Sequence, residues 1–383
     1  MSHVVDVLMP AYNAGPTIRV AVESILGQNV TDLQLHVVDD GSTDETVAVL
    51  ADLAATDPRV HIHTQANEGV VDALNNGLAH CTAEFVARMD ADDIAYPDRL
   101  ERQLAFFRAH ADVIAVSGAM RHVDADGTPT GSIGRAGSPE DADPFFVPSI
   151  EPYLIHPAMT CRRAVLVAAG GYRHVCHAED TDLYWRLRAF GRLYNIDEIV
   201  GDYRLHANSI SGGSIVNGRI MSVSSQLAAL SAQRRLQGRA DIAFHKDSLA
   251  RYRAATTLER IVDIAVEQLE DGERTRLEEA AAAKLMELAA YRPYELEASD
   301  CAFIGKLARR GFDRLPSYNR RLLRRQIAGT AARIVATGRW RDANAMLSPA
   351  IYPGFATRAA ARVGLPDALR RKLRRGSSNS PLK

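Results

Sequence analysis

The sequence predicts an α/β fold, in which a mostly parallel, Rossmann-like sheet flanked by helices is followed by an all-α C-terminal module. Three observations predict it. Short apolar segments rich in β-branched residues alternate with segments of helical spacing over residues 4–118, which is typical of a parallel sheet covered on both faces. From about residue 217 only helical periodicity remains. Residues 1–214 carry 15 basic and 30 acidic residues, whereas residues 215–383 carry 31 basic and 17 acidic residues.

The elements of the first module are expected in the following order. Strands are predicted over residues 4–9, 33–38, 60–64, 85–89 and 113–118, with helices over residues 17–26, 44–53, 70–79 and 99–109. Thr43 or Asp44 is expected to cap the second helix. Residues 120–160 are rich in Gly, Pro and Asp and predict loops with an irregular hairpin, and a further strand is expected over residues 158–161. We therefore expect a catalytic domain over residues 1–214 and a helical module with a basic tail over residues 215–383.

The first two strands end in polar segments. Ligands of such sheets bind at the carboxyl ends of the strands, so these segments are candidate binding residues. The first is Pro10-Ala11-Tyr12-Asn13, and the second is Asp39-Asp40-Gly41-Ser42. Asp40 could accept the N3–H of a uracil base, with the ring of Tyr12 stacked on that base. A turn with a helix N-cap explains the same residues equally well. After the third strand, Asn67, Gly69 and Asn75 could contact a ribose or only stabilise loops.

Three carboxylates follow the fourth strand, in the segment Asp90-Ala91-Asp92-Asp93. Carboxylates this close repel one another unless a cation lies among them. Oxygen ligands suit Mg²⁺ or Mn²⁺, so the segment predicts a divalent cation site. The alternative is a solvated acidic turn before the next helix.

Two later segments carry further charged residues. Glu179, Asp180 and Asp182 crowd the first turn of a predicted helix, where the helix dipole favours anions and where one carboxylate could serve as a general base. Arg204 and His206 would share one face of a strand, and a cation beside an imidazole suits a diphosphate and its metal.

Taken together, the order of these motifs resembles that of the family 2 inverting glycosyltransferases of the GT-A fold, over about residues 3–214. The matching segments, in order, are Pro10-Ala11-Tyr12-Asn13, Val38-Asp39-Asp40-Gly41-Ser42, Asn67-x-Gly69, Asp90-x-Asp92-Asp93, Glu179-Asp180-x-Asp182-Leu183 and Tyr203-Arg204-x-His206-x-x-Ser209-x-Ser211. The helical remainder of the chain matches no pattern of that family.

The resemblance implies roles for these residues. Asp180 would be the catalytic base with Glu179 beside it, and Asp92, Asp90 and His206 would bind the metal. His156 and Asp182 would lie in the acceptor region, where we also expect the loop of His174, Cys176 and His177 rather than a zinc site. The nucleotide-sugar donor would contact Pro10, Ala11, Tyr12, Asn13, Asp40, Asn67, Gly69, Asn75, Asp90, Ala91 and Arg204.

The expected function is metal-dependent transfer of a sugar from a nucleotide-diphosphate sugar to an acceptor hydroxyl, with inversion of the anomeric configuration. The donor is expected to be a UDP sugar, and the reaction to belong to cell-surface glycan or polysaccharide synthesis. Two alternatives compete with it. One is a catalytically inactive GT-A scaffold or binding subunit. The other is a sugar-phosphate nucleotidylyltransferase, which would need a cationic Gly-rich loop where Ala11-Tyr12-Asn13-Ala14 stands.

Partners and location follow from composition. Scattered cysteines and the lack of an apolar run of about 18 residues predict a cytoplasmic protein. Residues 301–383 carry 19 basic and 3 acidic residues. Three explanations stay open: peripheral contact with the inner membrane face, where a lipid-linked acceptor would lie, docking of the basic helices on the acidic catalytic domain of the same or a second subunit, or an inert, solvated tail. Few aromatic residues interleave with these charges, so nucleic-acid binding is not expected.

Overall fold

The computed structural model describes residues 3–205, 214–292 and 294–363, and it divides into two compact units. The first unit comprises Met1–Ala142, Glu151–His174 and Glu179–His206, and the second comprises Asp143–Ile150, Val175–Ala178 and Ala207–Lys383. Two short segments that precede residue 214 therefore pack with the helical part of the chain.

The first half of the first unit alternates strands and helices as predicted. Its elements are β1 (Val5–Ala11), α1 (Gly15–Leu26), β2 (Leu33–Asp39), α2 (Thr46–Thr56), β3 (Val60–Thr64), α3 (Val70–His80) and β4 (Phe85–Arg88). Helix α2 begins later than predicted, with Glu45 at the N-cap position. Asp44 is not the cap, because its carboxylate accepts hydrogen bonds from the backbone N–H groups of Thr46 and Gly15, both at 3.0 Å, and so joins two loops.

The second half of this unit is less regular. Its elements are β5 (Ile94–Ala95), α4 (Arg99–Ala109), β6 (Val113–Val123), β7 (Pro129–Gly134), the 3₁₀ turns η1 (Pro139–Asp141) and η2 (His156–Ala158), β8 (Thr160–Arg162), α5 (Arg163–Ala168), α6 (Glu179–Leu187) and β9 (Arg192–Arg204). The strand expected over residues 158–161 begins only at Thr160, because Ala158 belongs to the 3₁₀ turn His156–Ala158 instead.

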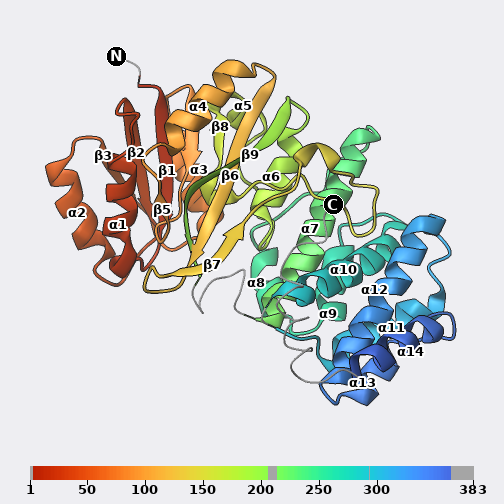
Figure 1. The fold of residues 1–383 in the computed structure, drawn as a ribbon. Coiled ribbons are helices and arrows are strands. Elements are labelled where there is room, and N and C mark those ends of the chain that lie inside the picture. Colours follow the sequence, from red (N-terminus) through yellow and green to blue (C-terminus); the bar gives the residue numbers. More distant parts are fainter. Residues whose placement is uncertain (1–2, 206–213, 293, 364–383) are drawn as a thin grey trace. The chain divides into compact units, whose positions relative to one another are not determined.

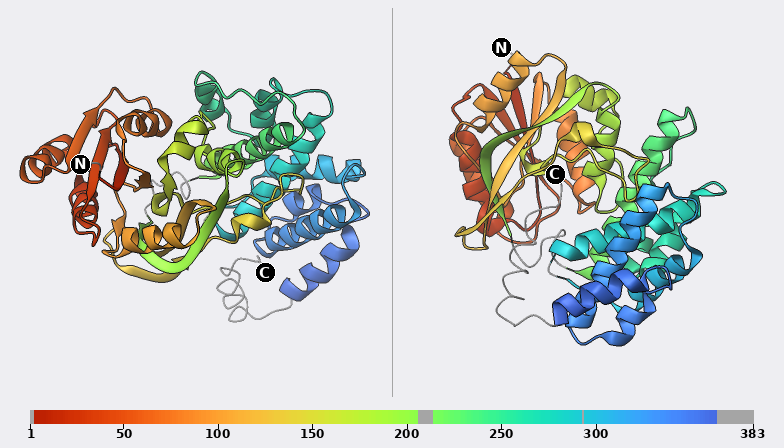
Figure 2. Two further views of the ribbon diagram at one scale, coloured as in Figure 1. Left: turned by 90° about the horizontal axis from the view of Figure 1, so that it is seen from above. Right: turned by 45° about the vertical axis from the view of Figure 1, so that its right-hand side comes forward.

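The strands form one sheet in the order β3-β2-β1-β4-β8-β6-β9-β5, with β7 paired to β6 (Figure 1). The four adjacent strands β3, β2, β1 and β4 are parallel, as the alternation of strands and helices predicts. Beyond β4 the sheet is mixed: β8 runs antiparallel to both of its neighbours, and β6 and β9 are parallel to each other. These two long strands bend together in both views of Figure 2. The carboxyl ends of β1, β2, β3 and β4 therefore share one edge of the sheet.

Each face of the sheet has its own apolar core. Alternate residues of β1 point to opposite faces. Val7 and Met9 pack in a cluster with residues of α1, α2 and α4, while Leu8 packs in a cluster with residues of α3, α5 and α6. Because helices cover both faces of the sheet, ligands are expected at the carboxyl ends of the strands.

The second unit is helical. Its helices are α7 (Ile215–Leu236), α8 (Ser248–Ala254), α9 (Leu258–Val266), α10 (Glu273–Tyr291), α11 (Ala298–Arg310), α12 (Ser317–Ala336), α13 (Trp340–Ala345) and α14 (Tyr352–Val363). Their apolar side chains form one core cluster of their own. Within that core Arg219 is buried and donates two hydrogen bonds, of 2.8 and 2.7 Å, to the carboxylate of Asp300. Within the described ranges no helix combines the length and the apolar character that a membrane span requires.

Candidate functional site

The loops after β1 and β2 are joined by hydrogen bonds. The backbone N–H of Asn13 donates to the hydroxyl of Ser42 at 2.9 Å, and the side-chain oxygen of Asn13 accepts from the backbone N–H of Thr43 at 2.8 Å. Asn13 therefore holds the two loops together, in a left-handed backbone conformation with φ of 48°. The ring of Tyr12, beside it, is 52% exposed. An exposed ring on a fixed loop is suited to stacking on a base, although its contact with a donor remains a prediction.

Asp40 is buried at the end of β2 and holds the next loop in place. Its Oδ1 accepts hydrogen bonds from the side chain of Gln65 at 2.8 Å and from the backbone N–H of Glu68 at 2.9 Å. Its Oδ2 accepts one from the backbone N–H of Gly69 at 2.8 Å. A carboxylate offers about four acceptor positions. The three hydrogen bonds use three of these positions, and a contact of Asp40 with the N3–H of uracil remains a prediction.

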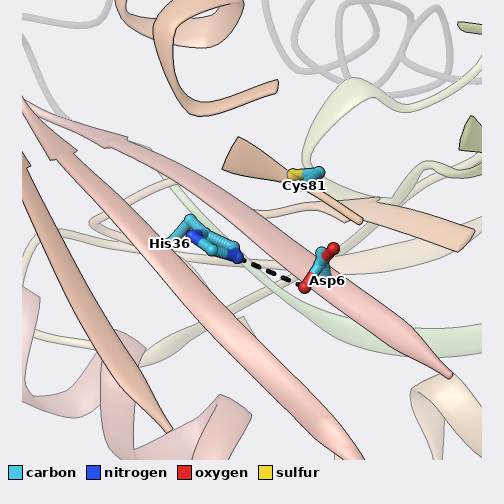
Figure 3. A group of neighbouring side chains, drawn as sticks. All are labelled: Asp6, His36 and Cys81. Carbon is cyan, nitrogen blue, oxygen red and sulfur yellow. Dashed lines mark hydrogen bonds and ion pairs between the residues drawn. The ribbon is translucent and has the colours of Figure 1, made fainter. Parts of the chain in front are cut away.

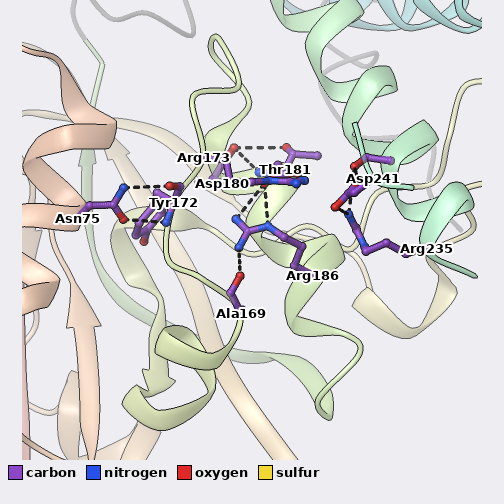
Figure 4. A network of polar contacts seen from close by, with 11 residues as sticks. Asn75, Ala169, Tyr172, Arg173, Asp180, Thr181, Arg186, Arg235 and Asp241 are labelled. Atoms are coloured by element: carbon purple, nitrogen blue, oxygen red, sulfur yellow. Dashed lines mark hydrogen bonds and ion pairs between the residues drawn. The ribbon is translucent and has the colours of Figure 1, made fainter. Parts of the chain in front are cut away.

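Asn67 and Asn75, both expected near the donor, lie differently. Asn67 is exposed on the loop that Asp40 holds. Asn75 instead uses both ends of its amide on the backbone of Tyr172: its N–H donates to the Tyr172 carbonyl and its oxygen accepts the Tyr172 N–H, both at 2.9 Å (Figure 4). The predicted ribose contact of Asn75 does not fit this geometry, because the amide is already committed to a link between α3 and the segment before α6.

The acidic residues after β4 form a cluster. One carboxylate oxygen of each of Asp90, Asp92 and Asp93 lies within 4.8 Å of the others. Asp93 is only 1% exposed; its Oδ1 accepts the backbone N–H of Arg204 at 2.8 Å, and its Oδ2 is buried without a hydrogen-bond partner among the described residues. Burial and the charges of Asp90 and Asp92 raise the pKa of Asp93 well above its usual value. A divalent cation would relieve both the repulsion and the unsatisfied oxygen, so these residues fit a bound metal.

Two other residues predicted near this cluster support its loop. Ala91 is buried, and its carbonyl accepts the hydroxyl of Thr17 at 3.0 Å, which ties the loop to α1. Arg204 donates from Nε to the carbonyl of Asp92 at 2.9 Å and from Nη1 to the carbonyl of Ala125 at 2.7 Å. The guanidinium therefore positions the acidic loop, and its contact with a diphosphate remains a prediction. His206 lies outside the described residues.

Arg88, the last residue of β4, was not predicted as a site residue. It is 5% exposed and forms an ion pair with Asp90, while its Nε and Nη1 have no hydrogen-bond partner in the described part of the chain. Burial opposes the charge, but the attraction of Asp90 prevails and raises the pKa of Arg88 above its usual value. The available signal was an arginine in an otherwise apolar strand, two positions before Asp90.

Glu179 and Asp180 begin α6 and are half-buried. Burial and the neighbouring charge of Asp180 raise the pKa of Glu179 to about 7. Burial, with the charge of Glu151, raises the pKa of Asp180 to about 6, against the opposing effects of the Thr181 N–H and Arg88. That N–H donates to Asp180 Oδ1 at 2.6 Å. Carboxyl groups that titrate near neutral pH are suited to proton transfer.

Asp182, expected in the acceptor region, is instead a structural residue. Its side chain is fully buried between two arginines: Arg173 and Arg186 each donate from Nε to Asp182 Oδ2 at 2.9 Å. Arg173 also donates to Oδ1, and Arg186 donates to the carbonyl of Ala169 at 2.5 Å. A carboxylate enclosed in this way cannot contact an acceptor, but it fixes the helix on which Glu179 and Asp180 stand.

His156 is also buried. Its Nε2 lies 2.9 Å from the hydroxyl of Tyr172, and burial together with the charge of Arg88 lowers the pKa of His156 well below its usual value. A neutral imidazole behind Tyr172 does not fit a direct acceptor contact. The trio of His174, Cys176 and His177 forms no metal-competent group among the described residues.

Comparison with known proteins identifies this arrangement. The sequence profile described as "Glycosyl transferase family 2" matches residues 6–168. The chain is also 32% identical over 211 residues to the putative glycosyltransferase EpsE of Bacillus subtilis, covering 54% of this chain and 73% of the relative. This chain belongs to glycosyl transferase family 2. Its enzyme class is therefore that of the glycosyltransferases.

Two further likenesses extend the comparison. The family 2 chain is 29% identical over 214 residues to a chondroitin synthase of Escherichia coli, and this match covers 54% of the chain but only 30% of the length of that relative. Its fold is similar to a crystal structure of S. aureus TarS residues 1–349 in complex with UDP-GlcNAc, with a TM-score of 0.50 at 17% identity, covering 94% of this chain and 92% of that one. The fold is therefore of the GT-A type, followed by a helical C-terminal region.

Proposed function

We propose that this family 2 glycosyltransferase transfers a sugar from a nucleotide-diphosphate sugar to an acceptor hydroxyl, with inversion of the anomeric configuration. A UDP sugar is the first donor to consider, and the product would be a polysaccharide or cell-surface glycan. The observation that carries the proposal is that Arg88 interacts both with the acidic cluster after β4 and with the two carboxylates at the start of α6. Arg88 pairs with Asp90 of the acidic cluster, and its charge also acts on Glu179 and Asp180. A metal-competent cluster and a candidate base therefore lie around one buried cation.

The acidic cluster is the proposed cation site. Asp92 and Asp90 would hold Mn²⁺ or Mg²⁺, with Asp93 behind them and His206 as a further candidate ligand. A cation bound there would neutralise charge that develops on the leaving diphosphate. The chain's own part is to fix the acidic loop: Arg204 donates to the Asp93 carboxylate and to the Asp92 backbone carbonyl, and Arg88 pairs with the Asp90 carboxylate.

Asp180 is the proposed general base, with Glu179 beside it. Because Thr181 occupies Oδ1 of Asp180, we assign the proton of the attacking hydroxyl to Oδ2. A pKa of about 6 leaves Asp180 mostly ionised at neutral pH, yet basic enough to accept that proton as the new glycosidic bond forms. Attack from the side opposite the leaving nucleotide diphosphate then inverts the anomeric carbon in one displacement.

The donor and product class rest on likeness. TarS, whose fold is similar, binds UDP-GlcNAc in its crystal structure, so UDP sugars are the first donors to test. Relatives named for polysaccharide synthesis, a chondroitin synthase of Escherichia coli and an amylovoran biosynthesis glycosyltransferase of Erwinia amylovora, support a glycan acceptor, lipid-linked or free.

The test is release of nucleotide diphosphate from a panel of nucleotide sugars with Mn²⁺, with and without glycan acceptors. We expect release that needs both the cation and one of the donors, and an inverted product in NMR coupling constants. Donor binding without turnover on any acceptor would favour the inactive scaffold, whereas retention of configuration would refute the single displacement.

The helical unit is proposed to position the enzyme rather than to take part in the chemistry. On α12 Arg321 and Arg325 are exposed and one turn apart, so they present charge on the same side. The basic segment Arg370–Arg375 lies outside the described residues. Cosedimentation with anionic liposomes tests a peripheral membrane role by comparing the full chain with a chain ending at Leu369, and equal, salt-insensitive partitioning would favour subunit assembly instead.

A further inference from the structure

A second cluster of potential metal ligands lies near the start of β1, at the end of the strand opposite to the acidic cluster. Asp6, His36 and Cys81 are all buried, and one oxygen, nitrogen or sulfur atom of each lies within 4.8 Å of the others (Figure 3). Asp6 stands near the start of β1, whereas the proposed donor site follows the ends of β1, β2 and β4. The cluster therefore belongs to the opposite end of the parallel strands and plays no part in the proposed transfer.

Asp6 is held as an oriented anion. Its Oδ2 accepts the backbone N–H groups of Thr82 and Ala83, at 2.6 and 2.8 Å. Its Oδ1 lies 3.2 Å from Nε2 of His36 and 2.5 Å from Nε2 of His3. Burial alone would raise the pKa of Asp6, but the hydrogen bond with His36 and those from the two N–H groups lower it to about 2. A carboxylate oriented by hydrogen bonds to one oxygen, with imidazoles gathered at the other, is a common arrangement around a metal.

His36 is oriented from behind by a second imidazole. Its Nδ1 lies 3.1 Å from Nε2 of His63, whose ring stacks on His80 with centroids 3.9 Å apart. Without an ion, Nε2 of His36 donates to the Asp6 carboxylate, so an ion at Nε2 would displace that proton. With the ion bound, Nδ1 of His36 would donate to Nε2 of His63, and metal-binding histidines are typically fixed by such a second hydrogen bond.

Cys81 supplies the third donor. It follows the end of α3, and its thiol is buried and donates a weak hydrogen bond to the carbonyl of Gly77 at 3.3 Å. Burial and the charge of Asp6 raise the pKa of this thiol to about 12, so without a cation the sulfur remains protonated. A metal binds the thiolate, and the thiol proton would leave to water as the ion binds.

We propose that Asp6, His36 and Cys81 form a binding site for a zinc-class transition ion, distinct from the Mg²⁺ or Mn²⁺ site at the acidic cluster. A mixed set of oxygen, nitrogen and sulfur donors suits Zn²⁺ or Co²⁺ and does not suit hard ions, which take oxygen ligands. The 3.2 Å between Asp6 Oδ1 and His36 Nε2 matches the spacing of two ligands about 2.0 Å from a tetrahedral ion.

The site would have a structural role. It joins β1 through Asp6, β2 through His36 and the end of α3 through Cys81, three segments that are otherwise held by packing and backbone hydrogen bonds. We therefore expect the ion to stabilise the fold without contributing to turnover.

Co²⁺ is the probe, because a thiolate ligand produces a charge-transfer absorption and tetrahedral geometry produces strong visible bands. The full-length protein, stripped of metal by a chelator, is titrated with Co²⁺ and then with Zn²⁺. We expect both absorptions to appear, to be abolished by Zn²⁺, and to persist in Asp92→Ala, which removes the proposed catalytic cation ligand.

The variants decide the assignment. Cys81→Ala should lose the charge-transfer band, and His36→Gln should weaken Co²⁺ binding by roughly tenfold or more. Cys161→Ala, which removes another buried cysteine, and His110→Gln, which removes an exposed imidazole after α4, are the matched controls and should bind as the unaltered chain does. Circular dichroism confirms folding, and Zn²⁺ should raise the melting temperature of the controls but not of Cys81→Ala. Absence of the band from the unaltered chain, or its survival in Cys81→Ala, would overturn the proposal and leave a metal-free hydrogen-bonded cluster.

Discussion

The backbone N–H of Arg204 donates a hydrogen bond of 2.8 Å to Oδ1 of Asp93, which joins the end of β9 to the acidic loop after β4 across 111 positions of the sequence. The other oxygen of Asp93 is left buried without a partner in the described residues. Asp93 is therefore both an anchor of the loop and a buried negative charge beside the two carboxylates that we expect to bind the cation.

We predict that Asp93→Asn weakens cation binding while it preserves the loop. The amide oxygen can still accept from Arg204, but one negative charge is lost, so the Kd for Mn²⁺ should rise about tenfold, or about 1.4 kcal/mol. Asp92→Ala should abolish metal-dependent nucleotide binding altogether. Calorimetric titration with Mn²⁺ measures both, with Asp126→Asn in the exposed hairpin loop as the control. Donor affinity that stays unchanged in EDTA would contradict the cation site.

A second prediction concerns pH. Asp180 must be ionised to act as a base, so kcat/KM should fall with a slope of one as pH drops below about 6, the raised pKa of Asp180. Arg88 opposes that rise, so Arg88→Gln should move this acidic limb to higher pH. The profile is measured with saturating cation and with folding checked at each pH. A limb that stays in place in Arg88→Gln would show that Arg88 does not act on the base.

Asp180→Asn should separate turnover from stability. Turnover should fall by about 10²–10⁴ because the amide cannot accept the proton, while donor binding persists. A raised carboxyl pKa means that the folded state binds more protons than the unfolded state, so Asp180 increasingly destabilises the fold as pH rises from its unfolded pKa to about 6, and the effect levels off above that pH. The variant should therefore unfold at a higher temperature than the unaltered chain at pH 8, with little difference at pH 4. Near-normal turnover would exclude Asp180 as the base.

Asp182→Ala should show the opposite pattern. It leaves Arg173 and Arg186 without their buried carboxylate, which should cost about 3–5 kcal/mol of unfolding free energy. Urea denaturation measures the loss, and Asp197→Ala at an exposed position is the control. Donor affinity per folded molecule should be unchanged, and a selective loss of acceptor binding would instead restore the acceptor role that the sequence suggested.

Tyr12→Ala tests the stacking role of the exposed ring. A base stacked on an aromatic side chain gains about 1–3 kcal/mol, so the Kd for nucleotide diphosphate should rise roughly tenfold or more. Tyr318→Ala, at an exposed position on α12, removes a similar ring from the helical unit and should leave the Kd unchanged. Equal effects of the two substitutions would argue against stacking.

The sequence by itself determined the α/β class, the four leading strands and the places where polar segments follow them. Such features depend on side-chain periodicity and turn residues within about ten positions, and both are visible in a single chain. For the same reason the motif order was enough to indicate the family, and the acidic segment after β4 was enough to indicate a cation site.

Only the tertiary structure decided which polar residues are committed to structure. Asn75 is bound to Tyr172 across 97 positions, Asp182 is enclosed by two arginines, and β8 enters the sheet antiparallel. It also drew attention to Arg88 and placed Asp6, His36 and Cys81 together. Burial and pairing arise from contacts between distant segments, and a lone Asn, Asp or His has the same local signal whether it faces a substrate or satisfies a buried backbone group.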